Sequence, residues 1–165
     1  MHSTMFEYRV TKYDPALRDA SGAYTRSEWT AVSDVGSSFN GILLTELAYL
    51  RIESAYIAVA LAFLRESGVT SLVVNSLENH RKTELTIGEG THLSLAQIGA
   101  TLSRLLREEF WCRLEGADSF VHIGYDYYMY IGVPVVCPKA RQLATAHGLF
   151  VEPFWSPYGD LGAAK

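Results

Sequence analysis

One segment decides the expected fold: residues 109–131, with the sequence EFWCRLEGADSFVHIGYDYYMYI. It predicts two strands on either side of a Gly116-Ala117-Asp118 turn. Successive side chains of a strand point to opposite faces of the sheet. We therefore expect Tyr125 and Tyr127 on one face of the second strand, and the other face to carry Asp126, Tyr128 and Tyr130.

The four tyrosines of this strand predict a recognition surface. A dry protein interior offers few hydrogen-bond partners for so many phenolic hydroxyl groups. Tyrosine also supplies rigid, amphipathic contact area where proteins bind one another. We therefore interpret residues 125–130 as a surface that binds another molecule.

Acidic charge gathers beside these tyrosines. Residues 107–126 contain five acidic and two basic side chains, which accounts for three of the chain's four net negative charges. Acidic groups speed the approach of a basic partner, and aromatic rings then supply contact energy. The acids expected to contact the partner are Glu115, Asp118 and Asp126. A solvated sheet face with tyrosines packed edge-on explains the same pattern.

A second group of polar and aromatic residues lies at positions 28–36 and includes Trp29 and Asp34. These two residues are further candidates for partner binding. Alternatively, the Asp34 side chain fixes a turn that ends at the following glycine, because an aspartate oxygen accepts hydrogen bonds from nearby backbone amides.

Composition limits the domain number and the classes of partner. A chain of 165 residues with 48% hydrophobic and 12% aromatic residues indicates one ordered globular domain, residues 1–165, with a loose tail at 153–165. The net charge is −4, only four of the 14 basic residues are lysines, and no basic run is longer than Arg81-Lys82. This charge pattern argues against nucleic-acid binding.

The cysteines and the apolar segments indicate a cytoplasmic protein. Cys112 and Cys137 are the only cysteines, and we expect two reduced, mostly buried thiols. Residues 1–10 lack the pattern of a signal peptide, and the longest apolar run, 56–64, is too short to span a bilayer. No membrane partner is expected.

Capping signals predict three helices. Thr45 and Gly68 delimit the first, and Ser94 with Gln97 forms a capping box for the second. A third, shorter helix covers residues 139–147, after Pro138. Alternating or apolar runs predict further short strands at 5–12, 28–35, 71–75, 83–87 and 149–151. The expected class is α+β, a single domain with a mainly antiparallel sheet packed against two to three helices.

No cofactor or metal site is expected, because the five histidines are scattered and none forms an H-x-x-x-H or H-x-H pair. An acid–base couple of His122 and Asp126 is the main catalytic alternative, since a carboxylate raises the basicity of an imidazole. Cys112 across the hairpin from His122 would supply a nucleophile for it. A structural histidine and a structural cysteine explain both positions without catalysis.

Four short motifs carry a resemblance to a known class of proteins. They are KYDP (12–15), EWT (28–30), SDVG (33–36) and GYDYYMYIG (124–132). With these motifs the chain resembles a small bacterial family whose members are similar to immunity proteins of contact-dependent or polymorphic toxin systems. The resemblance implies a cytoplasmic, non-catalytic protein that binds and inhibits a toxin.

The favoured function is therefore a cytoplasmic immunity-type inhibitor that occludes a basic toxin domain with an acidic, tyrosine-rich surface. One alternative is a small enzyme that uses His122 and Asp126. Another is a self-assembling scaffold, or a homodimer, in which the tyrosine strand pairs with a second copy as a sheet edge.

Overall fold

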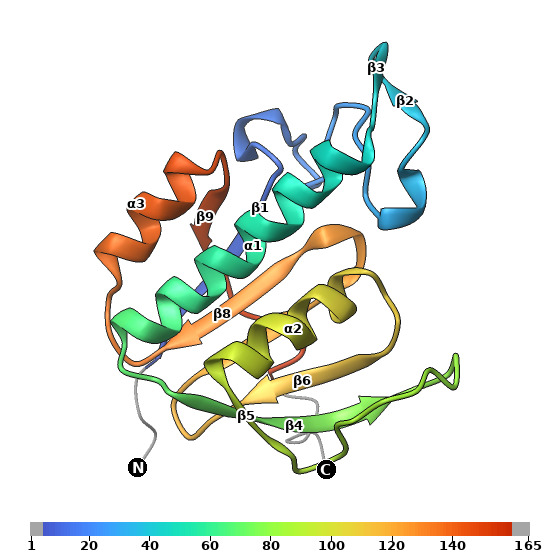
Figure 1. The fold of residues 1–165 in the computed structure, drawn as a ribbon. Coiled ribbons are helices and arrows are strands. Elements are labelled where there is room, and N and C mark those ends of the chain that lie inside the picture. Colours follow the sequence, from blue (N-terminus) through green and yellow to red (C-terminus); the bar gives the residue numbers. More distant parts are fainter. Residues whose placement is uncertain (1–4, 160–165) are drawn as a thin grey trace.

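Seven strands form the main sheet of the computed structural model, which describes residues 5–159. Their order is β5-β4-β6-β7-β8-β1-β9, and every neighbouring pair is antiparallel (Figure 1). The strands are β1 (Phe6–Thr11), β4 (Ser71–Glu78), β5 (His92–Ser94), β6 (Trp111–Glu115), β7 (Phe120–Ile123), β8 (Met129–Val133) and β9 (Phe150–Pro153). A separate hairpin pairs β2 (Ser38–Phe39) with β3 (Ile42–Leu43). The predicted α+β class is confirmed.

Three helices cover one face of this sheet: α1 (Glu46–Glu66), α2 (Leu95–Leu106) and α3 (Pro138–Ala146) (Figure 1). The capping residues predicted for these helices are confirmed. The Thr45 hydroxyl accepts a hydrogen bond from Ala48 N at 3.1 Å, and Ser94 and Gln97 cap each other's backbone amides. Gly68 and Gly148 follow α1 and α3 in the left-handed conformation that ends helices.

Helix α1 lies between α2 and α3 and also contacts β8. The apolar side chains on nearly all sides of this helix are covered because it has neighbours on more than one side. Among the described residues it is also the one helix whose length and composition would allow it to cross a membrane. Tyr56, Val59, Phe63 and Leu64 of this helix are fully buried here, as in the core helix of a globular domain. On α1, buried Glu53 is fixed by Arg107, with an Nη2 to Oε2 distance of 2.9 Å.

Two predicted strands are wrong because side chains bind the backbone that a sheet would need. In the region of 83–87, the Asn79 side chain accepts from Thr83 N at 3.0 Å and donates to Thr83 O at 2.7 Å, which closes a local loop. In the region of 28–35, the Asp34 carboxylate accepts from Thr30 N and Ala31 N and closes a single 3₁₀ turn. The main partner of β4 besides β6 is therefore β5, and not residues 83–87.

The other face of the sheet is covered in part by residues 154–159. Phe154 N donates to Glu7 O at 3.2 Å, and the Arg113 guanidinium donates to Tyr158 O at 3.2 Å. Arg9 lies against the Phe154 ring, 3.9 Å from its centroid. The prediction of a loose tail from residue 153 is therefore wrong as far as residue 159, and residues 160–165 lie outside the described part of the chain.

Candidate functional site

The predicted tyrosine strand is interrupted by a tight turn. β7 ends at Ile123, a 3₁₀ turn covers Tyr125–Tyr127, and β8 begins at Met129. Asp126 and Tyr127 have φ values of 59° and 67°, in the left-handed region that side chains other than glycine rarely adopt. Because the backbone reverses here, Tyr125 does not share a face with Tyr127, and that part of the prediction is wrong. Tyr127 and Tyr130 lie on opposite faces of the sheet, as predicted.

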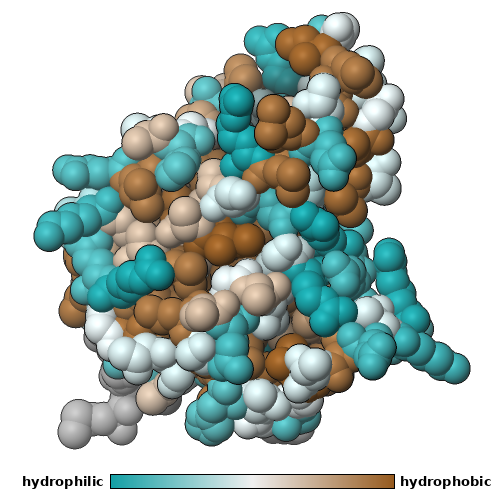
Figure 2. Space-filling view, in the orientation of Figure 1, coloured by the Kyte–Doolittle hydropathy of each residue, from teal (hydrophilic) through white to brown (hydrophobic). Residues whose placement is uncertain are grey.

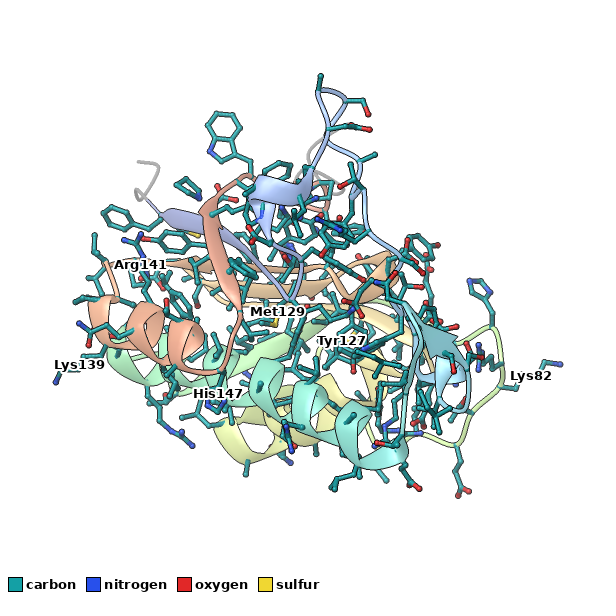
Figure 3. All side chains as sticks on the ribbon, turned by 90° about the horizontal axis from the view of Figure 1, so that it is seen from above. Lys82, Tyr127, Met129, Lys139, Arg141 and His147 are labelled. Carbon is teal, nitrogen blue, oxygen red and sulfur yellow. The ribbon has the colours of Figure 1, made fainter. Side chains whose placement is uncertain are left out.

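Tyr127 points into the core between the sheet and the helices (Figure 3). Only 2% of it is exposed, and its hydroxyl donates to the Tyr49 hydroxyl at 2.7 Å. Its ring makes edge contacts with Tyr56 and Trp29, each at a centroid distance of 4.9 Å. Tyr127 and Trp29 therefore have no free surface for a partner. The premise that the core could not satisfy several phenols is wrong, because Tyr127 bonds to Tyr49, and other buried phenols bond to backbone groups.

Two more buried tyrosines hold the turn from below. The Tyr56 hydroxyl donates to Tyr127 O at 2.9 Å and accepts from Lys12 N at 2.7 Å, while the Tyr13 hydroxyl donates to Asp126 O at 2.6 Å. Burial raises the pKa of the Tyr13 and Tyr56 phenols well above its ordinary value, so both remain protonated donors. The left-handed turn is thus fixed by the core.

Tyr128 and Tyr130 also have structural roles. The Tyr128 hydroxyl accepts a hydrogen bond from Arg18 at 2.9 Å, and its ring stacks on Tyr13 at 5.3 Å. Tyr130 is 7% exposed and packs against Phe154 and Tyr158 of the C-terminal segment. The buried position of Tyr130 contradicts its prediction as a surface residue, and Tyr128 is only partly exposed.

Tyr125 and Asp126 are the exposed residues of this turn. Tyr125 is 80% exposed, which is unusual for so large a ring in a folded domain. The other predicted acids are placed differently: Glu115 binds His122, and Asp34 caps its own turn. Asp118 lies in the turn between β6 and β7, roughly 15 Å along the hairpin from the end that carries Tyr125.

A cleft of about 570 Å³, which we call the acidic aromatic cleft, opens beside Tyr125. Its walls come from the ends of β4 and α2, the start of β6, the β7–β8 turn and the C-terminal segment. The aromatic side chains that line it are Phe110, Trp111, Tyr125 and Tyr158, and the carboxylates are Glu78, Glu108 and Glu109.

The aromatic wall of this cleft is ordered by specific contacts. The Trp111 indole donates to Ile123 O at 2.8 Å and packs against Tyr158, with ring centroids 5.4 Å apart. Gly124 allows this packing, because a Cβ at that position would lie 3.0 Å from the Tyr158 hydroxyl. The rings are therefore held in place by strand, turn and tail together.

The cleft carries more acid than base. The basic groups in its lining are Arg81 and His80, against three carboxylates. Glu109 is oriented by Arg104, whose Nε lies 3.0 Å from Oε1. Glu108 is exposed, and no ion pair among the described residues involves it. The cleft thus contains an unpaired carboxylate and one fully exposed ring, that of Tyr125.

Of the residues predicted to bind a partner, Tyr125 alone is among those that line this cleft, and the three carboxylates and the other three aromatic residues are not among the predicted contacts. Two of these missed residues are Glu78 and Tyr158. They are far apart in the chain and carry no local signal. A shift of register between Asn75 and Glu78 in β4 places Glu78 opposite Trp111, and the ordered C-terminal segment brings in Tyr158. Neither contact follows from periodicity.

His122 forms a different pair from the predicted one. It is fully buried, its Nε2 lies 3.0 Å from Glu115 Oε2, and its Nδ1 lies 2.7 Å from Ser156 Oγ. Burial alone would raise the pKa of Glu115, but hydrogen bonds from His122 and Asn75 outweigh it and lower this pKa below its ordinary value. The predicted couple with Asp126 is wrong, because Asp126 is on the exposed turn.

The cysteines match the structural alternative. Both are fully buried free thiols, and burial raises the pKa of Cys112 to about 12, so it is not a thiolate at neutral pH. Cys112 and His122 point to opposite faces of the sheet, because Arg113 and not Cys112 is paired with His122. Within residues 5–159, no group of three or more His, Cys, Asp or Glu side chains is arranged to hold a metal ion.

The tyrosine segment is not at a sheet edge. β7 and β8 lie in the middle of the sheet, between β6 and β1, so all their pairing positions are used. Self-assembly by addition of another copy to this strand is therefore excluded. The outer strands of the main sheet are β5 and β9.

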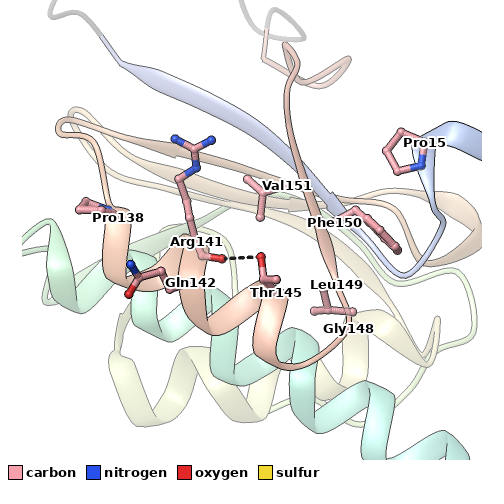
Figure 4. A pocket seen from close by; sticks show the side chains of 9 residues that line it. All are labelled: Pro15, Pro138, Arg141, Gln142, Thr145, Gly148, Leu149, Phe150 and Val151. Atoms are coloured by element: carbon pink, nitrogen blue, oxygen red, sulfur yellow. Dashed lines mark hydrogen bonds between the residues drawn. The ribbon is translucent and has the colours of Figure 1, made fainter.

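Two other surface features lie away from the cleft. A groove of about 610 Å³ separates α3 from β9, with Arg141 as its one charged lining residue (Figure 4). Exposed apolar side chains gather on the β2–β3 hairpin and the adjoining first turns of α1 (Figure 2). They are Ile42, Leu43, Leu47 and Leu50.

Comparisons of this chain with protein families, with curated protein sequences and with solved structures find no match.

Proposed function

We propose that this protein is a non-catalytic, cytoplasmic binding protein of the immunity type, which inhibits a toxin by receiving a basic part of it in the acidic aromatic cleft. The observation that carries the proposal is that the exposed Tyr125 ring and the free carboxylate of Glu108 line the same formed cleft. Large exposed rings next to unpaired charge are typical of protein-binding surfaces.

The charges and the rings have separate roles in this proposal. The carboxylates of the cleft attract a basic surface and raise the rate of encounter, an effect that salt weakens. The rings of Trp111, Tyr125 and Tyr158 then exclude water from the contact and limit dissociation. A toxin that uses basic side chains on its own substrate would lose them to this cleft.

The test is purification of the tagged full chain from a lysate of the bacterium that encodes it, followed by mass spectrometry. We expect a stoichiometric partner with a basic domain, and loss of this partner in Tyr125→Ala and in Glu108→Gln. The partner should regain its toxicity in a growth assay when it is co-expressed with either variant in place of the wild-type chain. Asp118→Asn is the matched control, because it also removes one carboxylate but lies at the other end of the hairpin.

Two outcomes would overturn the proposal. A partner that stays bound to both cleft variants uses another surface. A protein that elutes alone and suppresses no toxicity has no such partner. Light scattering on the same samples measures whether the protein forms a homodimer. Binding in the cleft does not depend on dimer formation.

A second candidate function is a small hydrolase, favoured by the Ser156–His122–Glu115 chain of hydrogen bonds. A nucleophile, a base and an orienting acid within hydrogen-bond distance are the arrangement that acyl transfer uses. In such a reaction Ser156 Oγ would attack an ester carbonyl, its proton would pass through His122 to the leaving alcohol, and water would release the acyl group. The non-catalytic explanation is that these hydrogen bonds attach the C-terminal segment to the sheet.

A fluorophosphonate probe separates the two explanations. A hydrolase reacts with the probe at Ser156, and Ser156→Ala abolishes the reaction while Ser67→Ala, a serine that binds helix carbonyls, retains it. Absence of covalent labelling in the folded wild-type protein would exclude the hydrolase.

A further inference from the structure

We infer that the acidic aromatic cleft selects arginine, and not lysine, as the side chain that its partner inserts. This inference rests on the proposed function, because it names the group that the same cleft receives. The preference for arginine depends on the aromatic side chains that surround the carboxylates of the cleft. The negative charge of the carboxylates attracts arginine and lysine alike, and does not by itself distinguish them.

A guanidinium fits this cleft better than an ammonium group for two physical reasons. It is planar and weakly hydrated, so it stacks on aromatic faces, and the cleft has four aromatic side chains in its lining. It also forms two parallel hydrogen bonds with one carboxylate, which a lysine cannot do. An ammonium group would have to give up more of its hydration to enter between the rings.

The carboxylates are suitably available for such a contact. Glu109 uses Oε1 to bind Arg104, and this bond holds the side chain at the wall of the cleft. Glu108 is exposed and unpaired, as described above, so both of its oxygens can accept from a guanidinium. Glu78 is exposed too and lies 3.6 Å from His80, an ion pair only if His80 is protonated.

The protein itself shows how a guanidinium is accommodated on its aromatic surfaces. Arg104 lies 5.3 Å from the Phe110 ring centroid while it binds Glu109, so one guanidinium contacts a ring and a carboxylate at the edge of the same cleft. An incoming arginine between Glu108 and the Tyr125 ring would repeat this combination. Arg81, which also lines the cleft, would oppose it by charge repulsion.

The experiment is a titration of the ¹⁵N-labelled full chain with N-acetyl-arginine amide and, separately, with N-acetyl-lysine amide, followed by NMR. We expect the arginine derivative to bind about five-fold or more tightly than the lysine derivative. The shifted signals should be those of the Trp111 indole and the backbone of residues 124–126, and not that of the buried Trp29 indole. The chain has three tryptophans, and a Trp111→Phe variant assigns the indole signal that reports on the cleft.

Three variants complete the test. Glu108→Gln should weaken arginine binding about five-fold or more, and Arg81→Gln should strengthen it. Asp118→Asn should leave it unchanged. Equal affinities for the two derivatives, or shifts outside the cleft, would overturn the inference. Such a failure is distinct from failure of the proposed function, because loss of the protein partner in Tyr125→Ala is measured without either derivative.

Discussion

Replacing Tyr56 by phenylalanine should destabilise the protein far more than the loss of one hydroxyl suggests. The Tyr56 hydroxyl is fully buried and bridges two backbone groups, Lys12 N at 2.7 Å and Tyr127 O at 2.9 Å. In Tyr56→Phe both groups lose their partner. A buried polar group left without a hydrogen bond costs about 1–3 kcal/mol, so with two such groups we expect a loss of about 2–6 kcal/mol in the free energy of unfolding.

The matched control is Tyr127→Phe. It removes the hydrogen bond between the hydroxyls of Tyr127 and Tyr49 and leaves both backbone groups paired. We expect this change to cost about 1 kcal/mol. Both rings stay the same size, so neither variant creates a cavity.

Urea unfolding of both variants, followed by circular dichroism, measures the difference. The midpoint of Tyr56→Phe should fall well below that of Tyr127→Phe, with similar slopes. Equal midpoints would refute the reasoning, because they would mean that the Tyr56 hydroxyl does not hold the turn.

Three further predictions follow from the same region. Tyr125→Ala should change the melting temperature little, because the ring is 80% exposed, whereas Tyr128→Ala should cost about 2 kcal/mol, because it removes the stacking on Tyr13; differential scanning calorimetry compares them. Asp126→Val should cost roughly 1–2 kcal/mol, because a β-branched residue is strained at a φ of 59°, while Asp126→Asn should be nearly neutral in urea unfolding. Stability should also fall as the pH rises above 10: a buried phenol keeps its proton in the folded chain and loses it in the unfolded chain, at up to about 1.4 kcal/mol per pH unit for each phenol. Lys12, whose pKa burial lowers to about 8, acts in the opposite sense between pH 8 and 10.5, so the fall should dominate above that range. The tyrosinate absorbance of the buried phenols should appear together with unfolding. The phenols concerned are Tyr13, Tyr49, Tyr56 and Tyr127, and no loss of stability by pH 11.5 would contradict their burial.

The helices of this protein could be predicted because their signals are local. Ser94 and Gln97 cap each other across a single turn, and Gly68 and Gly148 end helices within one residue of the expected position. The strands were harder, since a strand forms only if its backbone groups are free. The side chains of Asn79 and Asp34 form hydrogen bonds with nearby backbone groups, which then cannot pair with another strand. A hydrophobic pattern does not reveal these bonds.

The candidate site could be predicted only in part for a similar reason. Of the residues predicted to bind a partner, Tyr125 and Asp126 are exposed at the end of the sheet where the cleft opens, whereas Asp118 lies at the other end of the hairpin. Tyr125 and Tyr127 do not share a face, because two left-handed residues break the alternation of the strand. The cleft itself depends on Glu78 and Tyr158, which approach Trp111 through a register shift and an ordered tail.

The turn that carries Tyr125 separates two kinds of position in the sequence. Its backbone is determined by buried residues, Tyr13, Tyr56 and Tyr127, whose replacement disturbs the fold. The Tyr125 side chain makes few contacts within the chain and is free to vary. Substitutions at this one position can therefore alter the preferred partner while the scaffold stays intact, so binding specificity can diverge in evolution without a loss of folded protein along the way.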